Sequence, residues 1–321
     1  MQVCITGGAG FIGSALARHA LELGHSGRLL DDLSTGSLSN LEGLLDHPRL
    51  TFLEGSCLDA ARVSEAAEGC ELIFHLAAVV GVSLVHERAV SAIQTNVIGT
   101  DLVLHEALRR GAKVFLASSS EVYGLGESGL MSESSSLQLG RTDRPRGAYG
   151  CTKALDEWLA FAYQREQGLR FVIGRFFNTS GPRQSARYGM VLPRFVRSAL
   201  SGEPLTVYGD GQQTRCFCHV SDVVDAVWRL AQSPQCEGQI YNVANEQRVS
   251  IESLARRVIE RCESRSELRY VPFTEIYGEG AEDPRHRLPC TQKIQRDLGW
   301  APQRSLDVLI DDLIDFVQGE A

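Results

Sequence analysis

A tyrosine and a lysine four residues apart are the pair in this sequence best suited to act together chemically. Tyr149 and Lys153 stand in the stretch Tyr-Gly-Cys-Thr-Lys, and this spacing places both side chains on one face of a helix. A nearby ammonium stabilises a phenolate, which can take the proton of a sugar hydroxyl while the carbon gives up hydride to a nicotinamide. The chain has eight tyrosines but only three lysines, so coincidence explains the pair poorly.

Polar residues at the end of an apolar run supply a second candidate catalytic group. Ser118, Ser119, Ser120 and Glu121 follow the run 114–117, and α/β proteins bind ligands at the carboxyl edge of the sheet. Ser119 could hydrogen-bond the same hydroxyl that Tyr149 deprotonates. Glu121 has two interpretations that the sequence leaves open: an acid or base, or a carboxylate that holds neighbouring backbone in place.

A glycine-rich segment near the N-terminus has the spacing of a phosphate cradle. The segment Gly7-Gly8-Ala9-Gly10-Phe11-Ile12-Gly13 follows an apolar stretch and opens a helical pattern, so its backbone could approach a pyrophosphate at a helix N-terminus. Asp31, 18 residues past Gly13, stands where a carboxylate accepts the ribose hydroxyls of NAD and repels the 2′-phosphate of NADP. No arginine occurs in 32–36, so we expect NAD as the cofactor.

The elements that must position these residues alternate along the first half of the chain. Apolar runs predict strands, and apolar residues at helical spacing predict helices between them. The expected strands are 2–6, 28–31, 51–53, 72–76, 114–117 and 171–175, and the expected helices are 11–23, 89–110 and 148–167. This order predicts an α/β fold with a Rossmann-type doubly wound parallel sheet.

After the sixth strand, loops rich in Gly, Pro and Arg alternate with further helices and isolated short strands. We expect residues 1–175 to form the NAD-binding domain and residues 176–321 a smaller C-terminal α/β lobe that mainly binds the substrate. A helical pattern and a short strand within about 215–245 are expected to return to the first domain.

Composition and charge exclude several classes of protein. The chain of 321 residues is 43% hydrophobic and 22% charged, which is typical of folded globular proteins. Its net charge of −8 comes without a basic tract, so nucleic acid is a poor partner. No apolar run approaches the roughly 20 residues that cross a bilayer, and no basic segment precedes the first strand, so we expect a cytoplasmic protein.

The nine cysteines show no paired spacing, which suits a reducing compartment better than a disulfide framework. Cys216, Cys218 and His219 form the one local cluster. A strand would place the two thiols on one face and the imidazole on the other, so we expect no metal site.

Taken together, GGAGFIG, Asp31, SSSEVYG and YxxxK resemble the extended short-chain dehydrogenases that modify nucleotide sugars, the group of UDP-glucose 4-epimerases, UDP-glucuronate decarboxylases and 4,6-dehydratases. The resemblance covers essentially the whole chain. It implies tightly bound NAD, a nucleotide-diphosphate sugar as substrate, with UDP the expected nucleotide, and a homodimer through the helices at 89–110 and 148–167.

The resemblance also implies roles for individual residues. Cofactor contacts are implied for Gly7, Gly10, Phe11, Ile12, Gly13, Asp31, Asp32, Thr35, Gly36, Ser56, Cys57, Leu76, Ala77, Ala78, Asn96, Tyr149 and Lys153. Substrate contacts are implied for Ser119, Asn178, Leu192, Tyr208, Arg215 and Arg287. The family's aspartate against adenine is replaced here by Ser56, which offers a weaker contact.

Members of this group all oxidise C4 of the sugar first and differ in the later steps of the reaction. The segments 75–82 and 31–36 read like those of epimerases, so we expect a 4-epimerase of a neutral nucleotide sugar. The alternative is a UDP-glucuronate decarboxylase, because Ser119-Ser120-Glu121 is closer to the decarboxylase motif. A 4,6-dehydratase lacks support, since Ser120 stands in place of the acid. A non-catalytic NAD sensor is also disfavoured, because Tyr149 and Lys153 are both present.

Overall fold

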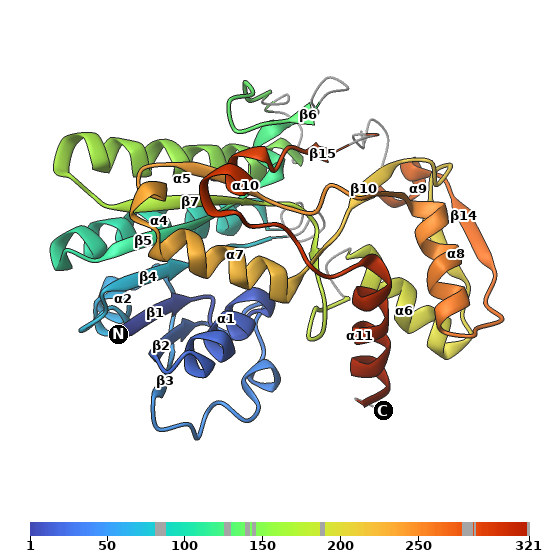
Figure 1. The fold of residues 1–321 in the computed structure, drawn as a ribbon, viewed down its shortest axis with the longest axis horizontal. Helices are drawn as coiled ribbons and strands as arrows, with labels where there is room; N and C mark the ends of the chain where they lie inside the picture. Colours follow the sequence, from blue (N-terminus) through green and yellow to red (C-terminus); the bar gives the residue numbers. More distant parts are fainter. Residues whose placement is uncertain are drawn as a thin grey trace.

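A central sheet of seven parallel strands forms the larger part of the protein, seen in a computed structural model that describes residues 1–80, 88–124, 130–138, 142, 146–186, 190–277, 285 and 287–319 (Figure 1). In spatial order the strands are β12 (Ile240–Val243), β7 (Phe171–Phe176), β5 (Lys113–Ser119), β4 (Leu72–His75), β1 (Gln2–Thr6), β2 (Ser26–Asp31) and β3 (Leu50–Glu54). The predicted doubly wound sheet is confirmed.

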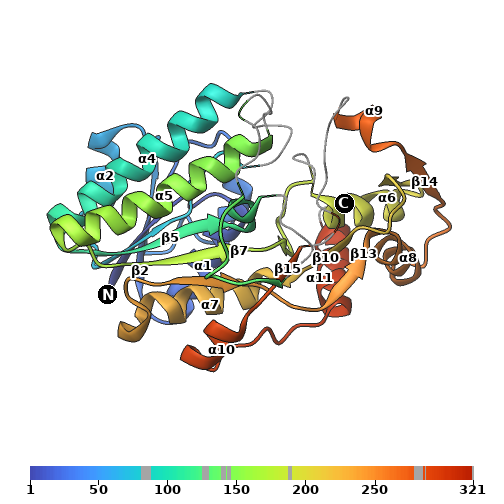
Figure 2. The ribbon, with the colours of Figure 1, turned by 90° about the horizontal axis from the view of Figure 1, so that it is seen from above.

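Helices cover both faces of this sheet (Figure 2). One face carries α2 (Ala60–Ala66), α4 (Ala89–Arg110) and α5 (Arg146–Gln167), and the other carries α1 (Phe11–Glu22) and α7 (Val220–Gln232). Successive strand residues point to opposite faces. Phe115 therefore packs into the core under α1 and α7, and its neighbour Leu116 packs into the core under α4 and α5. Burial on both faces explains why these strands are continuous apolar runs.

The chain reverses its direction of travel across the sheet between β1 and β4. Strands β2 and β3 extend the sheet on one side of β1, whereas β4, β5 and β7 extend it on the other. Such a switch point leaves a crevice at the carboxyl ends of the strands, where α/β proteins bind ligands. The loops after β1, β2, β4 and β5 all open there, and they carry most of the candidate residues.

A smaller lobe packs beside the carboxyl edge of the sheet (Figure 1). It has its own apolar core between α6 (Val191–Ser201), α8 (Ile251–Arg261) and α11 (Leu306–Gly319), beside the paired strands β9 (Leu205–Tyr208) and β14 (Leu268–Val271). Two elements that lie in the sequence between segments of the lobe belong to the large sheet instead. Helix α7 packs on the sheet, and β12 joins its edge next to β7.

Short elements connect the two parts. They are η1 (Leu38–Leu41), η2 (Ser120–Tyr123), β6 (Leu130–Met131), β8 (Thr179–Ser180), β10 (Thr214–Cys216), β11 (Cys218–His219), η3 (Pro234–Cys236), β13 (Arg248–Ser250), α9 (Phe273–Tyr277), β15 (Leu288–Pro289) and α10 (Gln292–Leu298). Within the described ranges, none of the helices combines the length and the apolar character that crossing a bilayer requires.

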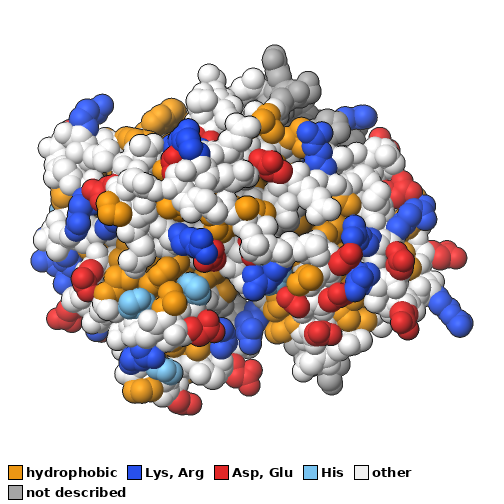
Figure 3. All heavy atoms as spheres, in the orientation of Figure 1, with side chains coloured by type: hydrophobic (Ala, Val, Ile, Leu, Met, Phe, Trp, Pro, Cys, Tyr) orange, Lys and Arg blue, Asp and Glu red, His pale blue; other side chains and the backbone are white. Residues whose placement is uncertain are grey.

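Acidic and basic side chains are interspersed over the face of the molecule shown in Figure 3. Some of them pair between helices of the small lobe, where Arg257 of α8 contacts Asp307 of α11 at 2.5 Å and Arg261 contacts Asp311. Exposed pairs of this kind contribute little to stability individually.

Candidate functional site

The glycine segment after β1 forms a tight turn into α1. Gly7 has a φ of +71°, and a Cβ at Gly13 would lie 2.0 Å from the carbonyl oxygen of Gly7. Side chains larger than hydrogen are therefore excluded where the turn closes. Gly10 precedes the helix, and no described side chain caps the helix N-terminus. The first N–H groups of α1 thus remain available to an anion.

Asp31 ends β2 beside this turn. Its carboxylate accepts backbone N–H bonds from Ala9 at 2.9 Å and Leu33 at 2.8 Å. Burial raises the pKa of Asp31, and the backbone hydrogen bonds partly offset that effect. A carboxylate held in this way at the end of β2 fits the ribose hydroxyls of NAD, and the turn before α1 fits its pyrophosphate. The residues present therefore fit NAD.

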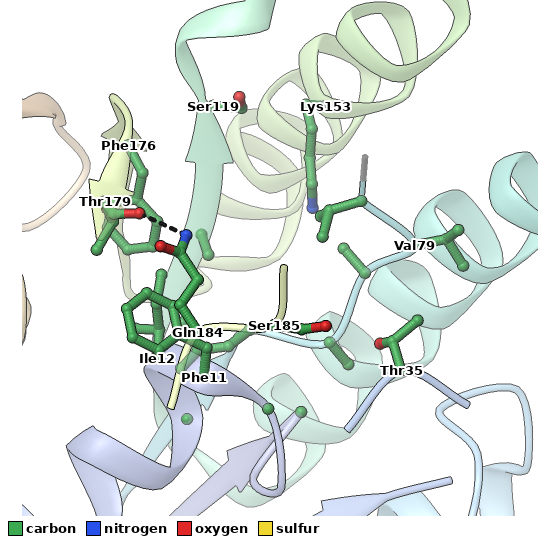
Figure 4. A pocket seen from close by; sticks show the side chains of 18 of the residues that line it. Phe11, Ile12, Thr35, Val79, Ser119, Lys153, Phe176, Thr179, Gln184 and Ser185 are labelled. Atoms are coloured by element: carbon green, nitrogen blue, oxygen red, sulfur yellow. Dashed lines mark hydrogen bonds between the residues drawn. The ribbon is translucent and has the colours of Figure 1, made fainter. Parts of the chain in front are cut away.

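The proposed reacting groups converge at the far end of the same cavity, which has a volume of about 460 Å³. In Figure 4, Lys153 projects from α5 into the cavity, Ser119 lies at the end of β5, and Phe11 and Ile12 line the opposite side. Tyr149 lines the cavity from the same helix as Lys153. Both residues thus line one cavity from the same helix, and their joint catalytic role stays a prediction.

Tyr149 lies in an environment that opposes its ionisation. Burial raises the pKa of Tyr149, the negative charges of Glu121 and Asp156 raise it further, and a hydrogen bond from Ser119 partly offsets the increase. Ser119 also accepts the backbone N–H of Glu121 at 3.2 Å, which fixes the start of η2. Burial and the two carboxylates therefore oppose ionisation of the phenol, and a positive charge beside it favours the phenolate.

Glu121 makes a two-point ion pair with Arg287. The Nη1 and Nη2 atoms of Arg287 donate to Oε1 and Oε2 of Glu121 at 2.6 and 2.8 Å. Arg287 is buried, and both residues line the cavity beside Tyr149. A paired guanidinium and carboxylate form strong, geometrically defined hydrogen bonds. The structure thus gives Glu121 a side-chain partner, Arg287, and its role as an acid or base or as a carboxylate that holds the backbone stays a prediction.

A second cavity continues from the first into the small lobe. The two share six lining residues: Glu121, Asn178, Thr179, Gln184, Met190 and Arg287. Farther into the lobe, Arg194 covers the ring face of Tyr208 with 4.4 Å between its guanidinium carbon and the ring centroid. This aromatic and guanidinium pair lines a pocket that suits a planar base.

The structure brings most of the predicted site residues into these two cavities. The cofactor residues that line the first are Gly7, Gly10, Phe11, Ile12, Gly13, Asp31, Asp32, Thr35, Cys57, Leu76, Ala77, Ala78, Tyr149 and Lys153, together with the catalytic candidates Ser119 and Glu121. The substrate candidates Asn178, Leu192, Tyr208, Arg215 and Arg287 line the second.

Three predicted cofactor residues lie outside the lining. Gly36 is placed against Asp31, where a Cβ would lie 2.7 Å from the Asp31 Oδ1 atom. Ser56 accepts the backbone N–H of Leu58 at 3.2 Å. Asn96 accepts the N–H of Val79 at 2.8 Å, so it holds a lining segment from behind. Their direct contact with NAD stays a prediction.

The segment after β7 contributes further lining residues that the predicted site did not include. Thr179, Gln184 and Ser185 line the cavity opposite α5, and the Gln184 side chain donates to the Thr179 carbonyl at 2.9 Å (Figure 4). Their segment follows β7 directly, and that position at the carboxyl edge was the available signal. Asp156 also escaped notice, although its spacing of three from Lys153 places both on one helix face.

Comparison with known proteins places this geometry among nucleotide-sugar enzymes. Residues 3–244 match the family model described as "NAD dependent epimerase/dehydratase family". The chain is 38% identical over 302 residues to a UDP-N-acetyl-alpha-D-glucosaminuronate decarboxylase of Bacillus cytotoxicus, with 94% of this chain and 92% of that relative covered. It is 36% identical over 310 residues to UDP-glucuronic acid decarboxylase 6 of Arabidopsis thaliana, with 95% and 85% covered.

A solved structure shares the fold along the whole chain. The UDP-glucose 4-epimerase of Thermotoga maritima, solved with UDP-glucose, is 26% identical and superposes with a TM-score of 0.89. The superposition covers 100% of this chain and 99% of that one.

Proposed function

Since the chain belongs to the NAD dependent epimerase/dehydratase family, we propose that it is a decarboxylase of UDP-linked uronic acids. Its cofactor is NAD. The observation that carries the proposal is the Arg287–Glu121 pair beside Tyr149, at the junction of the cofactor cavity and the small-lobe cavity. The two decarboxylase relatives support it. From the sequence we first expected a 4-epimerase, and a UDP-glucuronate decarboxylase was the alternative that we now favour.

The first chemical step oxidises C4 of the sugar. Tyr149 is the base that takes the C4 hydroxyl proton, Ser119 orients that hydroxyl, and Lys153 supplies the positive charge that favours the phenolate. NAD, when bound in the first cavity, would supply the acceptor for the hydride that C4 loses. The result is a 4-keto sugar whose C5 bears a carboxylate, which is a β-keto acid.

The β-keto acid then loses carbon dioxide. The C5–C6 bond breaks, and its electron pair moves toward the C4 carbonyl to give an enolate. Tyr149 and Ser119, which face the C4 oxygen, donate hydrogen bonds to the negative charge that develops there. Arg287 turns one of its two hydrogen bonds from Glu121 to the substrate carboxylate before that group departs as carbon dioxide. The enolate carbon C5 then takes up one proton that comes from solvent, and Glu121 relays it.

A 4-epimerase of a neutral UDP-sugar is the second candidate, and the superposition on a UDP-glucose 4-epimerase favours it. A neutral sugar carries a hydroxymethyl group at C5 in place of the carboxylate. Both curated relatives reported above are decarboxylases of uronic acids, which is why we place this function second.

We also propose that the enzyme is a homodimer through the outer face of α4 and α5, which lie side by side in Figure 2. Apolar side chains are exposed on these helices, including Val90 at 71%, Trp158 at 57% and Ile98 at 48%. Several large apolar side chains exposed on two adjacent helices are typical of a subunit interface. Residues 1–175 and 176–321 remain our proposed cofactor and substrate domains.

The test is to incubate the protein with UDP-glucuronate, UDP-N-acetylglucosaminuronate and UDP-glucose. Products are followed by mass spectrometry and anomeric proton NMR, with Tyr149→Phe as the inactive control. Loss of carbon dioxide from either uronate supports the proposal. Formation of the 4-epimer of UDP-glucose at unchanged mass, without decarboxylation of the uronates, would replace it with the second candidate.

A further inference from the structure

Lys153 has an acidic neighbour that the reaction described above does not use. Lys153 is 2% exposed and Asp156 is 1% exposed, and the Nζ atom lies 3.1 Å from Oδ2 of Asp156. Lys153 lines the cavity whereas Asp156 does not. Asp156 therefore meets the lysine from behind, on the side away from substrate and cofactor.

The ion pair between Lys153 and Asp156 is poorly suited to stabilise the fold. Oδ1 of Asp156 has no hydrogen-bond partner among the described residues, and an unpaired oxygen on a buried carboxylate is unfavourable. Burial raises the pKa of Asp156, and the charge of Lys153, its hydrogen bond and the hydroxyl of Thr100 oppose that effect. A buried charge pair with an unsatisfied atom is weak evidence for a stabilising role.

The other acids near Lys153 and Tyr149 already have cationic partners. Glu157, the next residue of α5, binds Arg175 at 2.6 and 2.9 Å. Glu121 of η2 binds Arg287. Asp156 is therefore the carboxylate that meets Lys153 directly.

His75 is the basic side chain that β4 contributes near Lys153, and it carries no charge. His75 of β4 is buried, and burial together with the charge of Lys153 lowers its pKa to about 3. Its two ring nitrogens lie 2.7 Å from the Thr6 hydroxyl and 3.0 Å from the Thr100 hydroxyl. The neutral imidazole leaves Lys153 and Asp156 as the charged pair behind Tyr149.

We propose that Asp156 is a positioning residue that holds the Lys153 ammonium in place and offsets part of its charge beside Tyr149. The inference rests on the proposed role of Tyr149 as the base and adds a determinant of when that base forms. The ammonium favours the phenolate, and the carboxylate behind the ammonium opposes it. Without Asp156 the full positive charge of Lys153 would act on Tyr149, and the phenolate would form at lower pH.

The experiment is a spectroscopic titration of the tyrosine in the NAD-loaded protein without substrate. The ultraviolet absorbance of phenolate is recorded against pH, and the curve of Tyr149→Phe is subtracted to isolate Tyr149. Asp156→Asn removes the charge at nearly constant shape. We expect it to lower the titration midpoint of Tyr149 by about one pH unit or more.

The pH–rate profile gives a second readout. Because the base must be deprotonated to act, the rate rises with pH through the titration of Tyr149. In Asp156→Asn the rising limb is expected to move to lower pH by the same amount as the absorbance midpoint. Asp156→Glu keeps the charge and should return the midpoint toward the wild-type value.

Glu157→Gln is the matched control. It breaks an equally buried acid–base pair one residue along the same helix, and the cation of that pair, Arg175, lines neither cavity. The glutamine oxygen can still accept from the hydroxyl of Ser118, which does line the first cavity. It is expected to lower the melting temperature and to leave the Tyr149 midpoint in place. An Asp156→Asn midpoint equal to that of wild type, or a shift matched by Glu157→Gln, would overturn the proposal.

Two further provisions keep the test decisive. Should Asp156→Asn not fold, Asp156→Ser removes the same charge with a smaller side chain and carries the same expectation. The absorbance titration needs no substrate, so it reports on Asp156 even if neither uronate is decarboxylated. Failure of the proposed function and failure of this inference are therefore separate outcomes.

Discussion

Arg287 reaches across 166 residues of sequence to bind both carboxylate oxygens of Glu121, at 2.6 and 2.8 Å, beside the proposed catalytic tyrosine. Glu121 follows β5 of the large sheet, and Arg287 precedes the two-residue strand β15. The pairing of Leu288 in β15 with Leu130 in β6 brings the arginine back to the sheet edge. The ion pair thus joins the last part of the chain to the reacting centre.

Loss of the Arg287 charge should impair turnover of a uronate. We expect Arg287→Gln to lower kcat/KM for UDP-uronate decarboxylation by about 100-fold or more, because the substrate carboxylate would lose its buried guanidinium and Glu121 would lose its two-point ion pair. Carbon dioxide release measured by NMR or mass gives the rate. Arg285→Gln is the control, since Arg285 is 79% exposed and lies 3.8 Å from Asp210. Equal activity in the two variants would contradict the role of Arg287.

The turn before α1 should tolerate no side chain at its closing glycine. We expect Gly13→Ala to abolish NAD retention during purification, because its Cβ would lie 2.0 Å from the Gly7 carbonyl oxygen. Gly27→Ala in β2 is the control, since its nearest neighbour would be a Leu50 methyl carbon at an ordinary 4.0 Å. The bound cofactor is measured by its absorbance after acid release. Full NAD occupancy in Gly13→Ala would contradict the proposal that the glycine turn before α1 binds the cofactor.

The fold and the cofactor end of the site were predictable because their signals are local. The apolar runs of the sequence coincide with β1 to β5 and β7, and the glycine turn and Asp31 lie within one βαβ unit. The Glu121–Arg287 pair left no such signal. It depends on β6 and β15, which have two residues each and therefore no periodicity to detect. Asp156 was within reach of helical spacing, but its burial against Lys153 becomes visible only in the packed structure.

A charge in the exposed apolar face of α5 should separate the proposed dimer. Trp158 is 57% exposed on the helix that lies beside α4. We expect Trp158→Arg to be monomeric by size-exclusion chromatography with light scattering, because an interface would have to bury the added guanidinium without a partner. Val308→Arg, on α11 at 41% exposure, is the control and should remain dimeric. A wild-type protein that is monomeric at high concentration would sink the dimer proposal.

Glu106 of α4 should make stability depend on pH in the acid range. Hydrogen bonds from Arg109 and Arg110 lower the pKa of Glu106 to about 2, although burial opposes them. Because the folded value lies below the ordinary one of about 4.3, the ionised carboxylate stabilises the fold above that pH. This contribution is lost as the pH falls through about 2. We expect Glu106→Gln to lower the free energy of unfolding by about 1–2 kcal/mol at pH 7, discounted because Arg109 is half exposed.

Urea denaturation of wild type and Glu106→Gln between pH 7 and pH 3 measures this dependence. The difference in the free energy of unfolding between the two proteins should stay constant down to about pH 4.5 and then shrink. Below that pH Glu106 binds a proton in the unfolded wild-type chain but stays ionised in the folded one, which favours unfolding. Glu65→Gln is the comparison, since Glu65 is 43% exposed and pairs with an exposed arginine, Arg62. Its effect should stay below about 0.5 kcal/mol at every pH. A Glu106→Gln difference that does not narrow below pH 4.5 would show that the lost stability comes from packing rather than from the charge.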